Sequence, residues 1–495
     1  MKKIIAVFTA AIVMLVFYGC SKEFLDTQNI NSINSDSFYT NEAEAIQAVT
    51  SVYAGLQLQG LYHRRIFFML DFASDEIDPT PNTQTPPSQL LGHTFDANNE
   101  HIVGVWGDSY ITIARANIAL ENIEKIEMNA TLQNRLLGEV RFIRALSYLN
   151  LVQNFGGVPL RVHTNEESTN LANWPRATEA EIFALIEEDL KFAESNLPAR
   201  SEYGADDLGR ATSGAAGGLL AKAYIYQEKW DDASKQCDKV IDSGEYALVE
   251  FARLMNSFNQ LDENNEESLF EVQFTANLNG GGGAWAVDQN TGWGGNGEGN
   301  FRPKEYGVNG FAFYNAKPSD ELVAAFEADD PRLQAFFFGP GSTFNGVPYD
   351  TIFDESGYAW AKYTDPAPGA SGALDDGEIN IRVLRFADIL LLKAEALIQL
   401  GNAAEGLDYI NQVRRRADPS GSILADRTDA SQALDYLIHE RRVELCGEQQ
   451  RRIDLVRWGI ADQFLTGFSN GKHEVFPIPG NELDTNTEVQ QNAGY

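Results

Sequence analysis

The feature that most constrains the fold is a helix that stops at a short polar turn and restarts at once. Residues 213–248 show it: a run of small residues breaks near Lys229 and a second helix restarts at Trp230. Asp231 favours the new N-terminus and Gly244 its end, so two antiparallel helices are predicted. The apolar positions of the first helix recur at helical spacing: Ala216, Leu219, Leu220, Ala223 and Tyr224.

The same pattern returns in residues 385–419. Gly401 is expected to end one helix and Asn402 to cap the next, while Pro419 marks the finish. A third helical stretch, residues 131–160, is expected to end at Gly156. Small residues allow close helix approach, as in tetratricopeptide-like pairs with a period near 34 residues. The repeats are degenerate, so the sequence predicts a mostly α scaffold of helix pairs rather than a regular solenoid.

Two stretches interrupt the helices. Residues 73–101 are rich in Pro, Thr and Asn, and residues 277–303 are rich in Gly and contain Trp285 and Trp293. Long loops in a compact chain are usually functional or disordered, and tryptophans argue against disorder. We therefore expect the second stretch to carry function.

The N-terminus has the pattern of an export signal. Lys2 and Lys3 precede an apolar run, residues 4–18, that is shorter than the about 20 residues of a membrane-spanning helix. The run stops at Gly19 and Cys20, which resemble a lipobox. The sequence predicts a signal peptide over residues 1–19 and an acylated Cys20 that tethers the mature protein to a membrane. The alternative is a plain secretory signal followed by an incidental cysteine.

The charge excludes one class of partner. The chain has 71 Asp and Glu residues against 38 Lys and Arg residues, a formal net charge of -33, which repels the phosphates of nucleic acid. Three cysteines are too few for a disulfide framework. We expect Cys237 and Cys446 to be buried thiols.

The stretch around residues 439–459 mixes carboxylates with arginines. Glu440, Glu444 and Glu448 follow one another at i,i+4 spacing, and Glu448 is placed to pair with Arg452. A catalytic centre is one interpretation. The sequence favours the other, a partly buried ion network that fixes a helix against its neighbours.

Three loop carboxylates have three interpretations. Asp75, Glu76 and Asp78 are residue types for a glycosidase acid and base, which need two carboxyl groups about 5–10 Å apart. They also suit the acceptance of hydrogen bonds from sugar hydroxyls, or a merely solvated acidic loop.

No motif predicts a metal or cofactor. Asp96, Asn98 and Glu100 resemble part of a calcium loop but lack its glycine and its terminal glutamate. The six histidines have no HExxH-like spacing, and no nucleophile elbow or phosphate-binding loop occurs in its required context. We expect no catalytic residue, no metal and no cofactor, and a structural calcium has no support.

Ordered matches along almost the whole chain carry a family resemblance. They are "FLDTQ", "FYTNEAEAIQAVTSVYAGL", "WGDSYITIARANIALENI", "GEVRFIRALSYLNLVQNFGGVPL", "GRATSGAAGGLLAKAYIY", "LRFADILLLKAEALIQLG", and the pair "HERRVELCGEQQRRIDLVRWG" and "VFPIPGNELDTNTEVQQNAGY". Together they resemble the SusD/RagB-like family of nutrient-binding outer-membrane lipoproteins. Thr487 and Gly447 depart from the family pattern, which usually has proline and an aromatic residue there.

The resemblance implies a SusD-like fold with a loop-rich region of a few short strands, and display on the cell surface. It implies capture of an oligosaccharide or polysaccharide and delivery to a SusC-like TonB-dependent transporter. A peptide ligand, as in RagB-like uptake, is an alternative, and a surface glycoside hydrolase is another. The implied regions are a signal peptide over 1–19, a lipid-anchored tether over 20–35, an N-terminal helix-pair region over 36–250 with a ligand-facing loop over 71–105, a loop-rich ligand-facing region over 251–380, and C-terminal helix pairs with a closing tail over 381–495.

The aromatic residues give the predicted binding site. Sugar rings present C–H faces with partial positive charge to the negative face of an indole, so Trp285 and Trp293 are expected to form a platform. Because family members bind ligand on loops beside the helix pairs, Phe72, Phe95 and Tyr306 are expected to line its rim. The alternative is that each tryptophan only pins its own loop. Trp106 and Trp458 lie on framework motifs and are assigned to the core.

Overall fold

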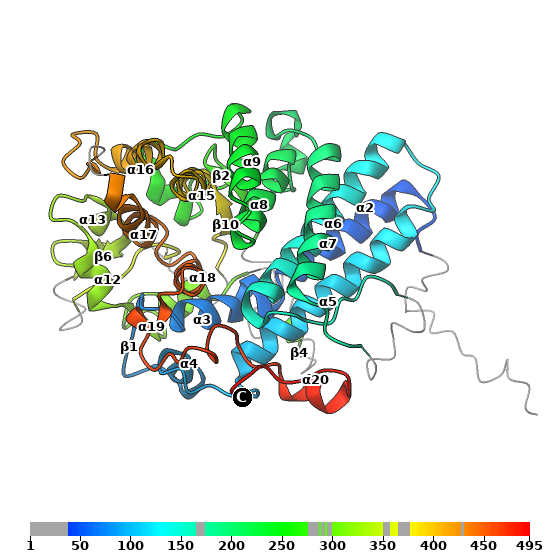
Figure 1. The fold of residues 1–495 in the computed structure, drawn as a ribbon, viewed down its shortest axis with the longest axis horizontal. Coiled ribbons are helices and arrows are strands. Elements are labelled where there is room, and N and C mark those ends of the chain that lie inside the picture. The colour runs from blue at the N-terminus through cyan, green and yellow to red at the C-terminus, as the bar shows by residue number, and fades with distance from the viewer. Residues whose placement is uncertain are drawn as a thin grey trace, which may run out of the picture.

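The computed structural model describes residues 38–164, 174–275, 287–288, 293–294, 299–349, 357–364, 377–426 and 430–495. The signal peptide and the tether that the sequence predicts, Cys20 included, lie outside these residues. The described chain is mostly helical (Figure 1). This confirms the predicted mostly α fold.

The helices of the described chain begin and end as follows. They are α2 (Glu42–Leu56), α3 (Arg65–Phe72), α4 (Thr85–Leu91), α5 (Glu100–Ile123), α6 (Ala130–Phe155), α7 (Glu179–Asn196), α8 (Ser213–Tyr226), α9 (Trp230–Asp242), α10 (Phe251–Leu254), α11 (Arg302–Tyr306), α12 (Asp320–Ala325), α13 (Arg332–Phe336), α15 (Phe386–Gln399), α16 (Ala403–Ala417), α17 (Ala433–Glu444), α18 (Arg451–Arg457), α19 (Ala461–Phe464) and α20 (Gly480–Thr485). Short 3-10 helices cover Arg200–Glu202, Ala205–Asp207, Met255–Phe258 and Ala430–Gln432, and a π-helical turn covers Gln59–His63.

The strands are short and lie mainly between α9 and α15. They are β1 (Ile77–Pro79), β2 (Ser268–Val272), β3 (Val287–Asp288), β4 (Trp293–Gly294), β5 (Ala316–Pro318), β6 (Phe337–Phe338), β7 (Thr343–Phe344), β8 (Val347–Pro348), β9 (Ala359–Trp360) and β10 (Ile381–Arg385). They form antiparallel pairs, β1 with β5, β2 with β10, β3 with β4, β6 with β9 and β7 with β8. Each pair ties together segments of the loop-rich region or fastens that region to the helices.

The long helices stack on one another in chain order. Helices α5, α6, α7, α8 and α9 pack each on the next, α15 packs on α9, and α16 and α17 continue the series. Figure 1 shows α2, α5, α6 and α7 on one side of the molecule, with α8, α9, α15, α16 and α17 running across the top. The stack forms the scaffold, and β1, α4 and α12 lie below it.

Local signals explain where these helices end. Helix α8 ends at Tyr226, α9 restarts at Trp230 with acidic residues in its first turn, and Gly244 adopts a φ of 69° just beyond its end. Gly401, with a φ of 85°, lies between α15 and α16, as predicted. The capping role predicted for Asn402 is wrong, because its side chain makes no capping hydrogen bond.

The C-terminal tail returns to the first half of the stack. The Phe476 amide donates to the Asn154 carbonyl at 2.7 Å, and the Asn492 side chain donates to the Phe155 carbonyl at 3.1 Å. Both acceptors lie in the last turn of α6, where carbonyl groups have no partner inside the helix. The tail therefore satisfies the end of α6 from more than 300 residues away in sequence.

The core predictions hold for the residues that the structure describes. Cys237 and Cys446 are free and buried, and burial raises the pKa of the Cys446 thiol to about 12. Trp106 is buried, whereas Trp458 is partly buried and donates to Glu395 at 2.8 Å. Within the described ranges, every helix is too short or too polar to cross a membrane.

Candidate functional site

The two segments predicted to face the ligand meet in the structure. Strand β1 belongs to the 71–105 loop and pairs with β5 of the loop-rich region, so that Asp78 lies opposite Lys317. Ser319, which follows β5, donates its hydroxyl to the Asp75 carbonyl at 2.6 Å and its backbone amide to the Glu76 carbonyl at 2.9 Å, just before β1 begins. Segments more than 200 residues apart in sequence thus form one face, which we call the β1–β5 junction (residues 75–84 and 301–320).

Threonine and asparagine side chains hold the loop that follows β1. The Thr80 hydroxyl donates to the Tyr314 carbonyl at 2.5 Å and the Thr83 hydroxyl to the Asn315 carbonyl at 2.7 Å. The exposed Asn82 donates its amide to the Phe313 carbonyl at 3.0 Å. These bonds satisfy the backbone carbonyls of residues 313–315, which form no regular helix or strand, and hold the loop after β1 against that segment.

The most exposed aromatic ring of the junction is that of Phe313. Its side chain is 37% exposed, the Lys304 ammonium lies 5.0 Å from the ring centroid, and Phe301 meets it edge to face at 5.9 Å. An aromatic ring among amide and ammonium donors suits a ligand with both apolar faces and hydroxyl groups. The sequence interpretation missed Phe313, although its place soon after Gly310, in a glycine-containing turn, was a usable signal.

The aromatic residues predicted to line the rim are in the core, so that prediction is wrong. Phe72 and Tyr306 are 0% exposed and Phe95 is 3% exposed. Tyr306 packs edge to face on Phe72 at 6.1 Å, and Phe95 packs on the tail residue Phe476 at 5.1 Å. These rings join α3 to α11 and the loop to the tail, and they have no face left for a ligand.

The predicted tryptophan platform is not tested by these contacts. Trp285 lies outside the described residues. Trp293 is described only as a backbone position in β4, paired with Asp288 of β3. Their role in binding stays a prediction.

The loop carboxylates Asp75 and Glu76 are not an exposed acidic pair. Asp75 is held by Arg451 at 2.8 Å and by Arg442 at 2.9 Å. Glu76 is 1% exposed and accepts one hydrogen bond, from the Gly447 amide at 3.1 Å. Both side chains are committed to the protein, so the expectation that they accept hydrogen bonds from a ligand is wrong. Asp78 pairs with Lys317 at 3.6 Å.

Glu76 is a buried carboxylic acid whose pKa is raised. Burial, with a further contribution from the nearby Asp71 carboxylate, raises the pKa of Glu76 from 4.5 to about 8. Its Oε1 atom has no hydrogen-bond partner within the described structure. Because the folded protein disfavours the ionised form of Glu76, this group lowers the free energy of unfolding progressively as the pH rises from about 4.5 to about 8.

Replacing Glu76 by glutamine is therefore expected to stabilise the fold at high pH. One pKa unit corresponds to about 1.4 kcal/mol, so the cost that the substitution removes reaches a few kcal/mol above pH 8. Glutamine keeps an oxygen that accepts from Gly447. Thermal melts at pH 5 and pH 8 check this: the variant should gain more at pH 8. An equal change in Tm at both pH values would show that Glu76 does not titrate as described.

The acidic and basic residues of the C-terminal stretch form the predicted, partly buried ion network: its carboxylates are buried, whereas Arg442 and Arg457 are partly exposed. Glu444, with no exposed side-chain area, accepts from Arg332 at 2.9 Å, from Arg385 at 2.6 Å and from Arg416. Burial alone would raise the pKa of Glu444, but these guanidinium groups hold that pKa well below its usual value. All these groups are paired inside the core, which favours the structural interpretation over catalysis.

One detail of that prediction is wrong. Glu448 pairs with Lys362 at 2.8 Å and with Arg385 at 2.8 Å instead of Arg452. The reason is that α17 ends at Glu444, so the i,i+4 geometry does not continue to Glu448. Arg452 donates to the His473 carbonyl at 2.8 Å and lies over the Phe476 ring.

The described residues contain no cluster of three or more His, Cys, Asp or Glu side chains placed to hold a metal ion. The Asp96 carboxylate accepts from the Asn98 amide at 2.8 Å in a local turn. Burial lowers the pKa of His63 to about 3, so this side chain is neutral at ordinary pH.

Two family models match this chain. One, described as the SusD family, matches residues 266–495, and the other, described as starch-binding associating with outer membrane, matches residues 23–225. SusD-like protein P25 of Formosa agariphila is 28% identical, and the alignment covers 98% of each chain. The first model matches the C-terminal half of the chain and the second the N-terminal half, and together they include most of the described elements.

Solved structures share the fold. A SusD superfamily protein from Bacteroides vulgatus is 29% identical with a TM-score of 0.79, covering 92% of this chain and 100% of that one. A laminarin-binding SusD-like protein is 27% identical with a TM-score of 0.77, covering 92% and 100%. The family models, the relative and the shared fold agree. The chain belongs to the SusD/RagB-like family.

Proposed function

We propose that this protein binds an oligosaccharide or polysaccharide at the cell surface and delivers it to a SusC-like TonB-dependent transporter. The observation that carries the proposal is the fold shared, at 27% identity, with a laminarin-binding SusD-like protein. The description of the family model over residues 23–225 supports both a carbohydrate ligand and an outer-membrane location.

The β1–β5 junction supports this function chemically. Phe313 offers an aromatic face, and Asn82 and Lys304 lie beside it with polar groups that suit sugar hydroxyls. The Gly-rich stretch with Trp285 and Trp293 leads directly into this segment of the chain. The two tryptophans stay the proposed aromatic platform of the glycan site, and we propose Phe313 as a further aromatic contact.

The carboxylates support binding without reaction. Glycoside hydrolysis needs two carboxyl groups that face the scissile bond. Asp75 is neutralised by two arginines, and Glu76 is buried behind the Gly447 backbone. In this arrangement neither reaches a ligand, which favours a binding protein over a hydrolase.

Delivery is tested by isolating the protein from detergent-solubilised outer membranes with a tag placed after Tyr495. We expect a TonB-dependent transporter to co-purify in near-equal amount and to be identified by mass spectrometry. Recovery of the tagged protein alone, under conditions where it still binds glycan, would restrict the function to surface capture.

The lipid anchor is tested at Cys20. Replacing Cys20 by alanine removes the sulfur that carries the acyl chain, so the variant should leave the outer-membrane fraction and fail to incorporate labelled palmitate. Cys237→Ala is the matched control, because that thiol is buried and should not be acylated. A Cys20→Ala protein that still takes up palmitate in the outer membrane would contradict the anchor.

A further inference from the structure

A cavity of about 350 Å³ shares no residue with the β1–β5 junction. Its walls come from the C-terminal half of α2, from the loop over residues 206–210, and from β2 with the residue that follows it. The side chains that matter for its chemistry are Tyr53, Ala54, Gln57, Asp206, Leu208 and Gln273. Ligand sites for small molecules usually have volumes of about 300–1,000 Å³. The cavity is large enough for one or two sugar units.

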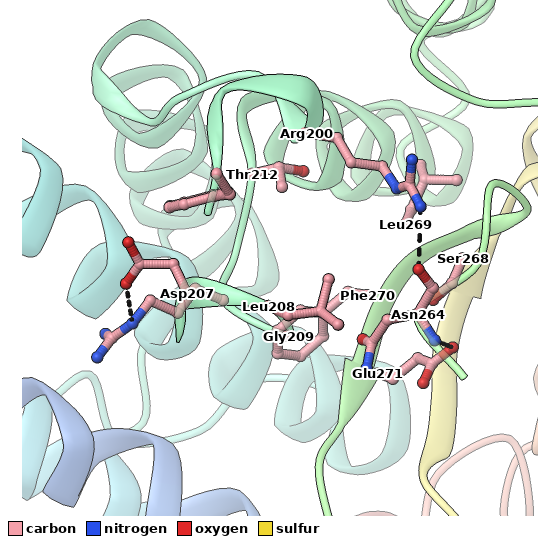
Figure 2. A pocket seen from close by; sticks show the side chains of 12 residues that line it. Arg200, Asp207, Leu208, Gly209, Thr212, Asn264, Ser268, Leu269, Phe270 and Glu271 are labelled. Atoms are coloured by element: carbon pink, nitrogen blue, oxygen red, sulfur yellow. Dashed lines mark hydrogen bonds and ion pairs between the residues drawn. The ribbon is translucent and has the colours of Figure 1, made fainter. Parts of the chain in front are cut away.

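The loop over residues 206–210 is held close to β2 in a shape that only glycine fits. Gly209 adopts a φ of 88°, and a Cβ atom there would lie 2.5 Å from the Gln273 side chain. Figure 2 shows a smaller recess on the same loop, with Leu208 and Gly209 between Asp207 on one side and Asn264 and Glu271 on the other. The loop thus forms a fixed wall of the cavity.

Three polar groups on the cavity wall have unused hydrogen-bonding capacity within the described structure. The Asp206 carboxylate is exposed and unpaired, and Gln57 donates to the Gln273 carbonyl at 2.8 Å but leaves its own Oε1 unused. The Tyr53 hydroxyl accepts from the Ala211 amide at 2.9 Å and donates to nothing. The wall therefore offers two acceptors and one donor.

The other charged and amide groups around the cavity are already paired. Arg210 binds Glu139 at 2.8 Å and Asp207 at 3.0 Å. The Gln273 and Asn264 amides bind each other at 2.8 and 3.0 Å. With its arginine neutralised and Asp206 unpaired, the wall repels an anion.

We infer that this cavity is a second site, which binds one or two units of a neutral carbohydrate. Hydroxyl groups both donate and accept, so a sugar can donate to Asp206 and Gln57 and accept from Tyr53. The exposed side chain of Leu208, 59% exposed, supplies an apolar edge for the C–H face of a ring. The choice of carbohydrate as ligand class rests on the proposed function, whereas the site itself rests on this cavity alone.

Saturation-transfer difference NMR with six neutral disaccharides, among them maltose, cellobiose and laminaribiose, tests the site. Ala54→Phe places a ring in the cavity without removing a polar group. It should weaken the binding of the disaccharide that gives the strongest signal at least tenfold. The matched control is Ala43→Phe, the same change at an exposed position of α2 outside the cavity, which should leave binding unchanged. Tm values of both variants report whether the helix tolerates the added ring.

Asp206→Ala is the second variant and removes only an exposed carboxylate. This variant should bind the same disaccharide several-fold more weakly, while its Tm stays unchanged. The double variant Trp285→Ala/Trp293→Ala should keep the disaccharide signal, because the cavity does not depend on the platform. Absence of signal with wild-type protein, or a signal that survives both Ala54→Phe and Asp206→Ala, would overturn the second site. A signal lost only in the tryptophan variant would also overturn it and would leave the proposed main site in place.

Discussion

Replacing Glu444 by alanine is expected to lower the free energy of unfolding by about 3–5 kcal/mol, the range found when one partner of a buried ion pair is removed. Glu444 has no exposed side-chain area and accepts from Arg332, Arg385 and Arg416. The substitution leaves guanidinium charge in the core without its main counter-charge. The network joins α13, β10, α16 and α17, so the loss should affect the whole C-terminal half.

Urea denaturation followed by circular dichroism measures this effect. The control is Glu188→Ala, the same change at a side chain that is 71% exposed and makes one ion pair with Arg141 at 3.4 Å. Exposed pairs of this kind contribute little, so the control should stay within about 0.5 kcal/mol of wild type. A Glu444→Ala protein as stable as the control would show that the buried network contributes no stability.

Replacing Trp285 or Trp293 by alanine is expected to weaken glycan binding by about 1–3 kcal/mol, the loss typical of truncated aromatic anchors. The physical reason is the loss of the indole face that stacks on a sugar ring. If the tryptophans serve the ligand rather than the core, the Tm should barely change. Titration calorimetry and thermal melts on both variants measure the two effects separately.

Trp106→Ala is the contrasting variant. Trp106 is 3% exposed and packs on Phe155 at 5.1 Å, so its loss should cost about 3–5 kcal/mol of stability. A large fall in Tm for Trp285→Ala or Trp293→Ala would place that tryptophan in a structural role. Unchanged affinity in both variants would move the aromatic contact to Phe313.

The helix pairs could be predicted because their signals are local. A glycine that adopts positive φ, such as Gly401, and acidic residues at a first turn, as after Trp230, act within a few residues of the helix end that they mark. Asn402 shows the limit of such signals. It lies at the right position, but its side chain makes no bond to the helix.

The candidate site could not be predicted to the same extent, because burial of a loop residue is decided by distant partners. Phe72 looks exposed in sequence, yet Tyr306, from another region, packs on it. Asp75 looks like a solvated carboxylate, yet its arginine partner Arg451 lies 376 residues away in sequence. A sequence pattern that covers ten or twenty residues does not contain this information.

The central claim is that this protein binds a glycan without cleaving it, and calorimetric titration of the mature protein with a polysaccharide panel that includes laminarin tests it most directly. We predict saturable binding of at least one glycan, which is recovered at its original length by chromatography after prolonged incubation. Failure to bind any glycan, or shortening of a glycan that disappears in Asp75→Asn or Glu76→Gln protein, would contradict the claim.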